Sequence, residues 1–293
     1  MNNIGFIGLG NMGKGMAINL SKNNLKVFGY DIDEQSFLKL TKHKVFKCKD
    51  IKNIVEQTEI IITMLPDGNI VKAVWQEIFK YNPKNKIIID CSTIDLKTSI
   101  EIQEYANKIN VETLDAPVSG GVMGAENGSL TFMVGGEEKT YKKTKFLFDI
   151  MGKNSILCGT IGAGQSIKMC NNMLLAITMT GLGESLKLAK NLNLDLEKFY
   201  DVLSTSSASC WAINNYFPIK GIGPKSPADN DFIGGFSSKL MLKDLRLAIE
   251  AAKSTNTNLN FGNQSKNNFA NLVNIGHGNL DFSNIINNLD QID

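Results

Sequence analysis

The sequence feature that most constrains the fold is a glycine-rich turn near the N-terminus. The apolar run at residues 4–7, IGFI, leads directly into GLGNMG, which has the spacing GxGxxG and precedes a helical pattern. This order is typical of the first βαβ unit of a dinucleotide-binding sheet. Gly8 would permit the tight turn, Gly10 would let a pyrophosphate approach, and Gly13 would allow close packing of helix on strand. We expect the whole loop to bind the cofactor: Gly8, Leu9, Gly10, Asn11, Met12 and Gly13.

An acidic residue follows at the spacing that such a unit requires. The second predicted strand, Lys26 to Tyr30, ends directly before Asp31. A carboxylate about 20 residues after the glycine loop accepts hydrogen bonds from the ribose hydroxyls of NAD. It would also repel the 2′-phosphate of NADP, and no nearby arginine follows Asp31 to offset that repulsion. The sequence therefore predicts NAD as the cofactor.

The chain of 293 residues changes character near its middle. Up to about Cys158, short β-branched runs alternate with helical patterns, which predicts a mainly parallel sheet covered on both faces. The runs EIIITM and KIIID are continuously apolar, as expected for central strands buried on both sides. After the glycine-rich segment Gly159 to Gly164, helical patterns continue to the end. We expect an α/β domain over residues 1–162 and an all-α domain over 163–293.

Composition excludes several other classes of protein. The formal charge is +2, without a basic patch beside aromatic residues, so nucleic acid is not an expected partner. Five scattered cysteines without a CxxC pair, and two histidines outside every motif, predict neither a disulfide framework nor a metal site. No run approaches the length of a membrane span, and no targeting segment opens the chain. We expect a cytoplasmic protein, or a mitochondrial matrix protein if this is a processed form.

Two loops after predicted strands should border the nucleotide, because parallel sheets bind ligands beyond the carboxyl ends of their strands. The first carries Leu65 and Pro66, and the second carries Ser92 and Thr93. Such residues are equally common as simple turn formers. A longer segment, residues 115–130, has no evident regular structure and contains Ser119, Gly120 and Gly121. Their consecutive N–H groups could bind a small carboxylate, although a mobile connector is the alternative.

A lysine interrupts an otherwise apolar helical pattern at residues 167–177, IKMCNNMLLAI. Lys168, Asn171 and Asn172 are spaced at i, i+3 and i+4, so they share a helix face, while Ile167 and Leu174 are expected to pack. If this face borders the nucleotide crevice, Lys168 could exchange a proton with a substrate hydroxyl while an asparagine holds it in place. A lysine that reaches solvent or pairs with a buried acid is the alternative.

Together these motifs resemble the β-hydroxyacid dehydrogenases, and among them the 3-hydroxyisobutyrate dehydrogenases. The resemblance covers nearly the whole chain and rests on GFIGLGNMG, ITMLPD, IDCSTID, DAPVSGGVMGAENGSLTFMVGG, GQSIKMCNNMLLAI, SSASCW, GGFSSKLMLKDLRLA and DFS. It implies an N-terminal Rossmann-type domain, an all-helical C-terminal domain that also serves oligomerisation, and assembly as a homodimer or homotetramer.

The resemblance also implies a role for particular residues. Lys168 matches the catalytic lysine, and Asn172, rather than Asn171, matches the asparagine that supports it. The loop Ser119, Gly120 and Gly121 matches the segment that binds the substrate carboxylate. The remaining matches are cofactor contacts: Leu65, Pro66, Thr93 and Lys243.

The reaction implied is oxidation of 3-hydroxyisobutyrate with NAD to methylmalonate semialdehyde, a step of valine degradation, with a small 3-hydroxy acid as the partner. Alternatives are reduction of tartronate semialdehyde or another short semialdehyde, and a non-catalytic NAD-binding regulatory module. The chain departs from close relatives at Ala208 and Ser209, where glycine and arginine are frequent, and at Ile70, where a polar side chain can contact the cofactor. These departures could alter affinity or substrate choice.

Overall fold

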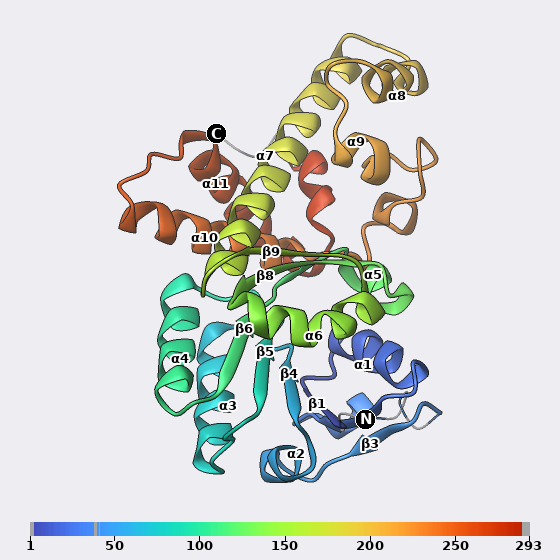
Figure 1. Cartoon of the computed structure of the whole chain (residues 1–293). Helices are drawn as coiled ribbons and strands as arrows, with labels where there is room; N and C mark the ends of the chain where they lie inside the picture. The colour runs from blue at the N-terminus through green and yellow to red at the C-terminus, as the bar shows by residue number, and fades with distance from the viewer. Residues whose placement is uncertain (1–2, 38–39, 41, 289–293) are drawn as a thin grey trace. The chain divides into compact units, whose positions relative to one another are not determined.

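The computed structural model describes residues 3–37, 40 and 42–288, which form two compact units (Figure 1). The first unit ends at Lys168 and the second begins at Met169. The long helix α7, Ala163–Asn191, therefore contributes its first turns to one unit and the rest to the other. The composition change predicted near residue 162 falls at the start of this helix.

The first unit is built on one sheet, which has nine strands in the described part of the chain. The order is β3-β2-β1-β4-β5-β6-β8-β7, and β9 pairs with β8. Most neighbouring strands are parallel, but β8 runs antiparallel to β6 and β7. The strands are β1 (Asn3–Ile7), β2 (Lys26–Tyr30), β3 (Val45–Lys47), β4 (Ile60–Thr63), β5 (Ile87–Asp90), β6 (Glu112–Asp115), β7 (Val118–Ser119), β8 (Leu130–Gly136) and β9 (Gly152–Gly159).

Helices cover both faces of this sheet, and a separate apolar core lies on each side. The central strand β4 shows why its sequence is continuously apolar, because Ile60 and Ile62 enter one core and Ile61 enters the other. Helices α1 and α6 contribute to the first core, and α2, α3 and α4 to the second. Their bounds are α1 (Gly13–Lys22), α2 (Ile51–Gln57), α3 (Gly68–Lys80), α4 (Leu96–Lys108), α5 (Gly121–Asn127) and α6 (Glu138–Met151).

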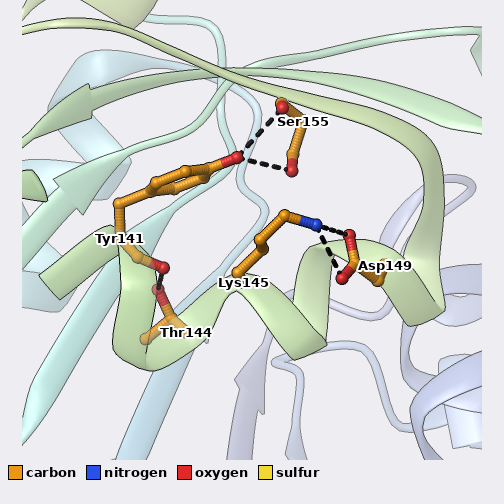
Figure 2. A network of polar contacts seen from close by, with 5 residues as sticks. All are labelled: Tyr141, Thr144, Lys145, Asp149 and Ser155. Carbon is orange, nitrogen blue, oxygen red and sulfur yellow. Dashed lines mark hydrogen bonds and ion pairs between the residues drawn. The ribbon is translucent and has the colours of Figure 1, made fainter.

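Polar contacts hold α6 against the edge strand β9 (Figure 2). The hydroxyl of Tyr141 lies 3.0 Å from the carbonyl oxygen of Ser155, to which it donates, and 2.9 Å from the Ser155 hydroxyl. On the exposed side of α6, Lys145 contacts Asp149 one turn further along, with 2.6 Å between Nζ and Oδ1. Such exposed pairs contribute little to stability, so Tyr141 and the apolar face of α6 fix the helix on the sheet.

The regular elements of the second unit's described residues are helices, joined by loops. Its core joins α7 to the other helices through apolar side chains such as Met179, Leu245 and Phe269. A bridge between Ser237 and Asp281 is the one β-type pairing outside the named strands in the described chain. The helices after α7 are α8 (Leu196–Thr205), α9 (Trp211–Tyr216), α10 (Ser238–Ser254) and α11 (Asn260–Asn274), with short 3₁₀ turns at Pro227–Asn230, His277–Asn279 and Phe282–Asn287.

The segment at residues 115–130 differs from the sequence expectation, because it is largely ordered rather than structureless. Strand β7 pairs with β8, and α5 begins after the single residue that follows β7. Gly120 precedes α5 with φ of 129°, and Gly128 ends it with φ of 65°. These left-handed positions favour glycine and enable sharp turns at both ends of a short helix. The glycines that suggested mobility therefore mark the ends of regular elements.

Candidate functional site

The glycine loop between β1 and α1 has a backbone that tolerates no side chain at two positions. Gly8 has φ of +94°, and a Cβ there would lie 2.2 Å from the Met64 carbonyl oxygen. A Cβ on Gly13 would lie 1.9 Å from the Gly8 carbonyl oxygen, so α1 starts directly against the turn. By contrast, a Cβ on Gly10 would meet nothing within 4 Å. The open side of the loop is therefore at Gly10.

The start of α1 suits an anion. The N-cap residue before it, Met12, makes no side-chain capping bond, and the first turn of α1 contains no acidic residue. Uncapped N–H groups and the helix dipole favour phosphate at such a position. Leu9 between the glycines is buried in the first core, whereas Asn11 is exposed. The loop therefore fits the pyrophosphate of a dinucleotide.

Asp31 lies beside this loop because β2 pairs with β1, with Tyr30 opposite Ile7. Its Oδ2 accepts from the Leu9 N–H at 2.6 Å, and its Oδ1 accepts from the Asp33 N–H at 2.8 Å. Each carboxylate oxygen has two lone pairs, so Asp31 can brace the loop and still accept from a ribose hydroxyl. The structure thus gives the residue a bracing contact that its sequence spacing did not predict.

A buried polar network orders the two strand-end loops. Asp90 Oδ1 accepts from the hydroxyl of Thr63 at 2.8 Å and from that of Ser92 at 2.6 Å. The Ser92 hydroxyl oxygen in turn accepts from the Leu65 N–H at 2.8 Å. The backbone at Leu65, before the exposed Pro66, is therefore held by the strand end that leads to Thr93.

Burial in this network raises the pKa of Asp90 to about 6, although hydrogen bonds from Ser92 and Thr63 partly oppose the rise. Within the described chain, Asp90 Oδ2 is buried without a hydrogen-bond partner. A carboxyl with a raised pKa in the folded state binds more protons when folded. Its contribution to stability is complete below about pH 4 and is lost as the pH rises through about 6.

Asp90→Asn should remove this pH dependence. Between pH 4 and 7, the wild type should lose roughly 2 to 3 kcal/mol of unfolding free energy relative to the variant. Only the wild type has a carboxyl group at this dry site that must ionise over this range. Urea titrations at several pH values measure the difference. A constant difference across that range would contradict the assignment.

The predicted carboxylate-binding residues lie where β7 meets α5. Ser119 pairs with Thr131 in the sheet, and Gly120 and Gly121 form the turn into the helix. Gly120 is the N-cap residue of α5 and has no side chain with which to cap the first N–H groups of the helix. Asn19 of α1 donates to the Ala125 carbonyl oxygen at 2.8 Å and holds α5 on the glycine-loop helix. The helices that follow the predicted phosphate loop and the predicted carboxylate loop are thus held together.

In α7, two of the predicted site residues are polar side chains on the buried face of the helix. Lys168 is 7% exposed and Asn172 is 2% exposed, whereas Asn171 is exposed. The expectation that Ile167 and Leu174 pack inside is wrong, since they are 45% and 60% exposed. Their apolar character had therefore indicated the wrong buried face. Burial also distinguishes Asn172 from Asn171, which helical spacing alone left equivalent.

Asn172 has a specific partner that sequence analysis missed. Its Nδ2 donates to Oδ2 of Asp244 in α10 at 2.5 Å, and Asp244 is buried. The Nζ atom of the adjacent Lys243 lies 3.5 Å from Asp244 Oδ1. Asp244 was not among the predicted site residues, but Met241, Asp244 and Leu245 follow the spacing of one buried helix face. That periodicity could have identified it.

Asn172→Ala should destabilise the fold, because it leaves the buried Asp244 carboxylate without this donor. We expect a loss of about 1 to 3 kcal/mol in the free energy of unfolding. The matched control is Asn191→Ala, since Asn191 is exposed at the end of the same helix and its change should stay within about 0.5 kcal/mol. Urea denaturation of both variants measures the difference, and equal losses would contradict the role of Asn172.

Two protein-family models match successive parts of the chain. Residues 3–162 match the NAD binding domain of 6-phosphogluconate dehydrogenase. Residues 162–289 match a family described as NAD-binding of NADP-dependent 3-hydroxyisobutyrate dehydrogenase. The chain therefore carries NAD(P)-binding domains.

Similar proteins match nearly the full length of the chain. The mitochondrial 3-hydroxyisobutyrate dehydrogenase of Drosophila melanogaster is 40% identical over 282 residues, which cover 96% of this chain and 87% of that protein. The mitochondrial enzyme of Mus musculus is 38% identical over 285 residues, which cover 96% of this chain and 85% of that protein. A solved structure of Mycobacterium tuberculosis 3-hydroxyisobutyrate dehydrogenase with L-serine has a TM-score of 0.94, with 37% identity and 99% of both chains covered. The chain belongs to the β-hydroxyacid dehydrogenase family.

As a member of this family, the chain is an oxidoreductase, and the predicted fold class is confirmed: an α/β Rossmann-type sheet is followed by a helical region. Among the described residues, no helix has the length and apolar character needed to cross a membrane. No group of three potential metal-binding His, Cys, Asp or Glu side chains occurs within that same part.

The departures from close family members lie in two helix-start regions. Ile70 is in the first turn of α3 and is 41% exposed. Ser209 lies just before α9, where its hydroxyl accepts from the Asn214 side-chain amide at 2.8 Å. Ala208 precedes it in the same exposed turn. Ser209 therefore has a local contact that an arginine would not reproduce.

Proposed function

We propose that this enzyme oxidises 3-hydroxyisobutyrate to methylmalonate semialdehyde with NAD, with Lys168 as the general base, and that it acts in valine degradation. The observation that carries the proposal is the buried polar face of α7, on which Lys168 and Asn172 replace apolar side chains. The support for the substrate is the name shared by relatives that are 37–40% identical over most of the chain.

The residues of the first unit fit a dinucleotide. Gly10 leaves space for the pyrophosphate beside the uncapped start of α1, and Asp31 carries a negative charge next to that loop. A carboxylate there favours the free ribose hydroxyls of NAD over the 2′-phosphate of NADP. Leu65, Pro66 and Thr93 would contact the same cofactor, and so would Lys243.

The chain's own residues supply binding, orientation and proton transfer. The N–H groups at Ser119, Gly120 and Gly121 would bind the substrate carboxylate, and this would orient the hydroxyl-bearing carbon. Neutral Lys168 would accept the hydroxyl proton as the C–H bond breaks and the carbonyl forms. NAD, when bound, accepts the hydride released from that carbon. Asn172 would hold the lysine and substrate in place, while Asp244 fixes its amide.

Because Lys168 must be neutral to accept the proton, oxidation should become faster as the pH rises, and semialdehyde reduction should show the opposite trend. Proton transfer by a positioned side chain of this kind contributes about 10² to 10⁴-fold to the rate.

The wider organisation is part of the same proposal. We assign the cofactor-binding domain, which also carries the carboxylate loop, to residues 1–162, and the substrate and oligomerisation domain, which carries Lys168, to residues 163–293, in a homodimer or homotetramer. Light scattering of the purified enzyme measures the oligomeric state. All five cysteines are free, which supports a reducing compartment such as the cytoplasm or the mitochondrial matrix.

A sister reaction is the second candidate, because the Mycobacterium tuberculosis relative is described with L-serine, another short 3-hydroxy acid. Reduction of tartronate semialdehyde would use the same carboxylate loop and lysine. Initial rates on a panel that contains 3-hydroxyisobutyrate, glycerate and L-serine separate the two. The proposal expects the highest kcat/KM for 3-hydroxyisobutyrate, and a higher value for glycerate would favour the sister reaction.

A further inference from the structure

Gln165 is a buried polar residue for which the proposed reaction has so far given no role. It lies in the first turn of α7 and is 0% exposed. Its position is i−3 relative to Lys168, so the two side chains lie on the same helix face one turn apart. Long polar side chains are rarely buried completely unless their hydrogen bonds are satisfied. Gln165 therefore has a defined set of partners.

Both ends of its amide bind the backbone of one loop. Oε1 of Gln165 accepts from the Ile94 N–H at 3.1 Å, and Nε2 donates to the Ser92 carbonyl oxygen at 2.8 Å. These two backbone groups flank Thr93, a predicted cofactor contact, in the loop between β5 and α4. A single side chain thus connects the loop that carries Thr93 to the helix turn before Lys168.

The turn that carries Gln165 is itself fixed by Asp115 at the end of β6. Asp115 Oδ1 accepts from the Gly162 N–H at 2.8 Å, and Oδ2 accepts from the Gln165 N–H at 2.9 Å. A Cβ on Gly164 would lie 2.3 Å from the Met133 carbonyl oxygen, so the helix starts directly on the backbone of the sheet. This close approach and the two hydrogen bonds leave the first turn little freedom to shift.

We propose that Gln165 is a positioning residue for the oxidation, which it assists by holding Lys168 and Thr93 in a fixed relation within the first unit. The inference rests on the proposed function of Lys168 as the base. Gln165 acts through its neighbours: the lysine must meet the substrate hydroxyl while the cofactor, contacted by Thr93, presents its acceptor carbon to the same substrate. A misplacement of about 1 Å between reacting groups can cost about 10²-fold in rate.

The first test is Gln165→Leu, which keeps a side chain of similar size but removes both amide hydrogen bonds. We expect kcat to fall by about 10-fold or more, with a smaller change in KM for the hydroxy acid, because alignment rather than binding is lost. Asn268→Leu is the matched control. Asn268 is also a buried amide, but it lies in α11, where it accepts from Gln264. It should lower thermal stability and leave kcat unchanged.

The deciding test is a double-mutant cycle with Lys168→Ala. If Gln165 acts through Lys168, adding Gln165→Leu to Lys168→Ala should lower kcat much less than it does in the wild type. Full additivity would overturn the inference, because the loss would then be independent of the lysine. Normal kcat in Gln165→Leu would also overturn it.

A second variant keeps the inference testable if Gln165→Leu does not fold. Gln165→Glu retains the acceptor for the Ile94 N–H but loses the donor to Ser92, so we expect a partial loss of kcat in a folded enzyme, and a normal kcat would contradict the inference. Failure of the proposed function is separately visible. It would appear as no turnover of any short hydroxy acid by the wild type, or as normal turnover by Lys168→Ala, and either result contradicts both proposals.

Discussion

Replacing Lys168 by alanine should lower kcat for hydroxy acid oxidation by about 10²-fold or more, the usual contribution of a positioned general base. The side chain is buried, and a methyl group can neither accept the substrate proton nor return it in the reverse direction. Binding of NADH should persist, because the predicted phosphate and ribose contacts belong to other residues. Stopped-flow or initial-rate assays give kcat, and NADH fluorescence titration gives the binding constant.

The matched control for this variant is Lys190→Ala. Lys190 lies in the last turn of the same helix and is exposed, so its removal makes the same change of charge and size away from the predicted site. We expect unchanged kcat for Lys190→Ala. Near-normal turnover by Lys168→Ala would exclude the lysine as the base, and loss of NADH binding would indicate a disturbed fold instead.

Removing the negative charge of Asp31 should shift the cofactor preference toward NADP. In Asp31→Asn one side-chain oxygen remains for the Leu9 N–H, so the loop keeps part of its bracing, while repulsion of a 2′-phosphate disappears. We expect the ratio of kcat/KM with NADP to that with NAD to rise by about 10-fold or more, equivalent to roughly 1.4 kcal/mol. Initial rates with both cofactors measure it.

Asp33→Asn provides the control for that change. Asp33 is exposed two residues further on, where its Oδ1 accepts from the Gln35 N–H. The same charge is lost there, so a general electrostatic effect would shift the cofactor ratio in both variants. We expect a shift for Asp31→Asn alone, and equal shifts would show that the Asp31 carboxylate does not contact the ribose directly.

Much of the first unit could be predicted because its determinants are local. The glycine spacing after IGFI matches a turn in which Gly8 and Gly13 leave no room for a side chain, and the continuous apolar run of β4 is typical of a strand buried on both faces. The short strands β3 and β7 were missed. Strand β3 is largely exposed and β7 has two residues, so pairing with neighbouring strands, rather than their own sequence, defines them.

The part of the candidate site in α7 was predictable only as far as helical spacing was sufficient. Spacing placed Lys168 and Asn172 on one face, but it could not say which face was buried, because that depends on elements distant in sequence. Ile167 and Leu174 were therefore assigned to the wrong side. Gln165 was missed because its importance lies in partners more than 70 residues away, at Ser92 and Ile94.

The most direct test of the whole account is the initial rate of NADH formation by the wild-type enzyme with 3-hydroxyisobutyrate, compared with NADPH formation under the same conditions. The account predicts methylmalonate semialdehyde as the product, and a kcat/KM with NAD well above that with NADP. Absence of turnover with either cofactor, or a higher kcat/KM with NADP, would contradict it.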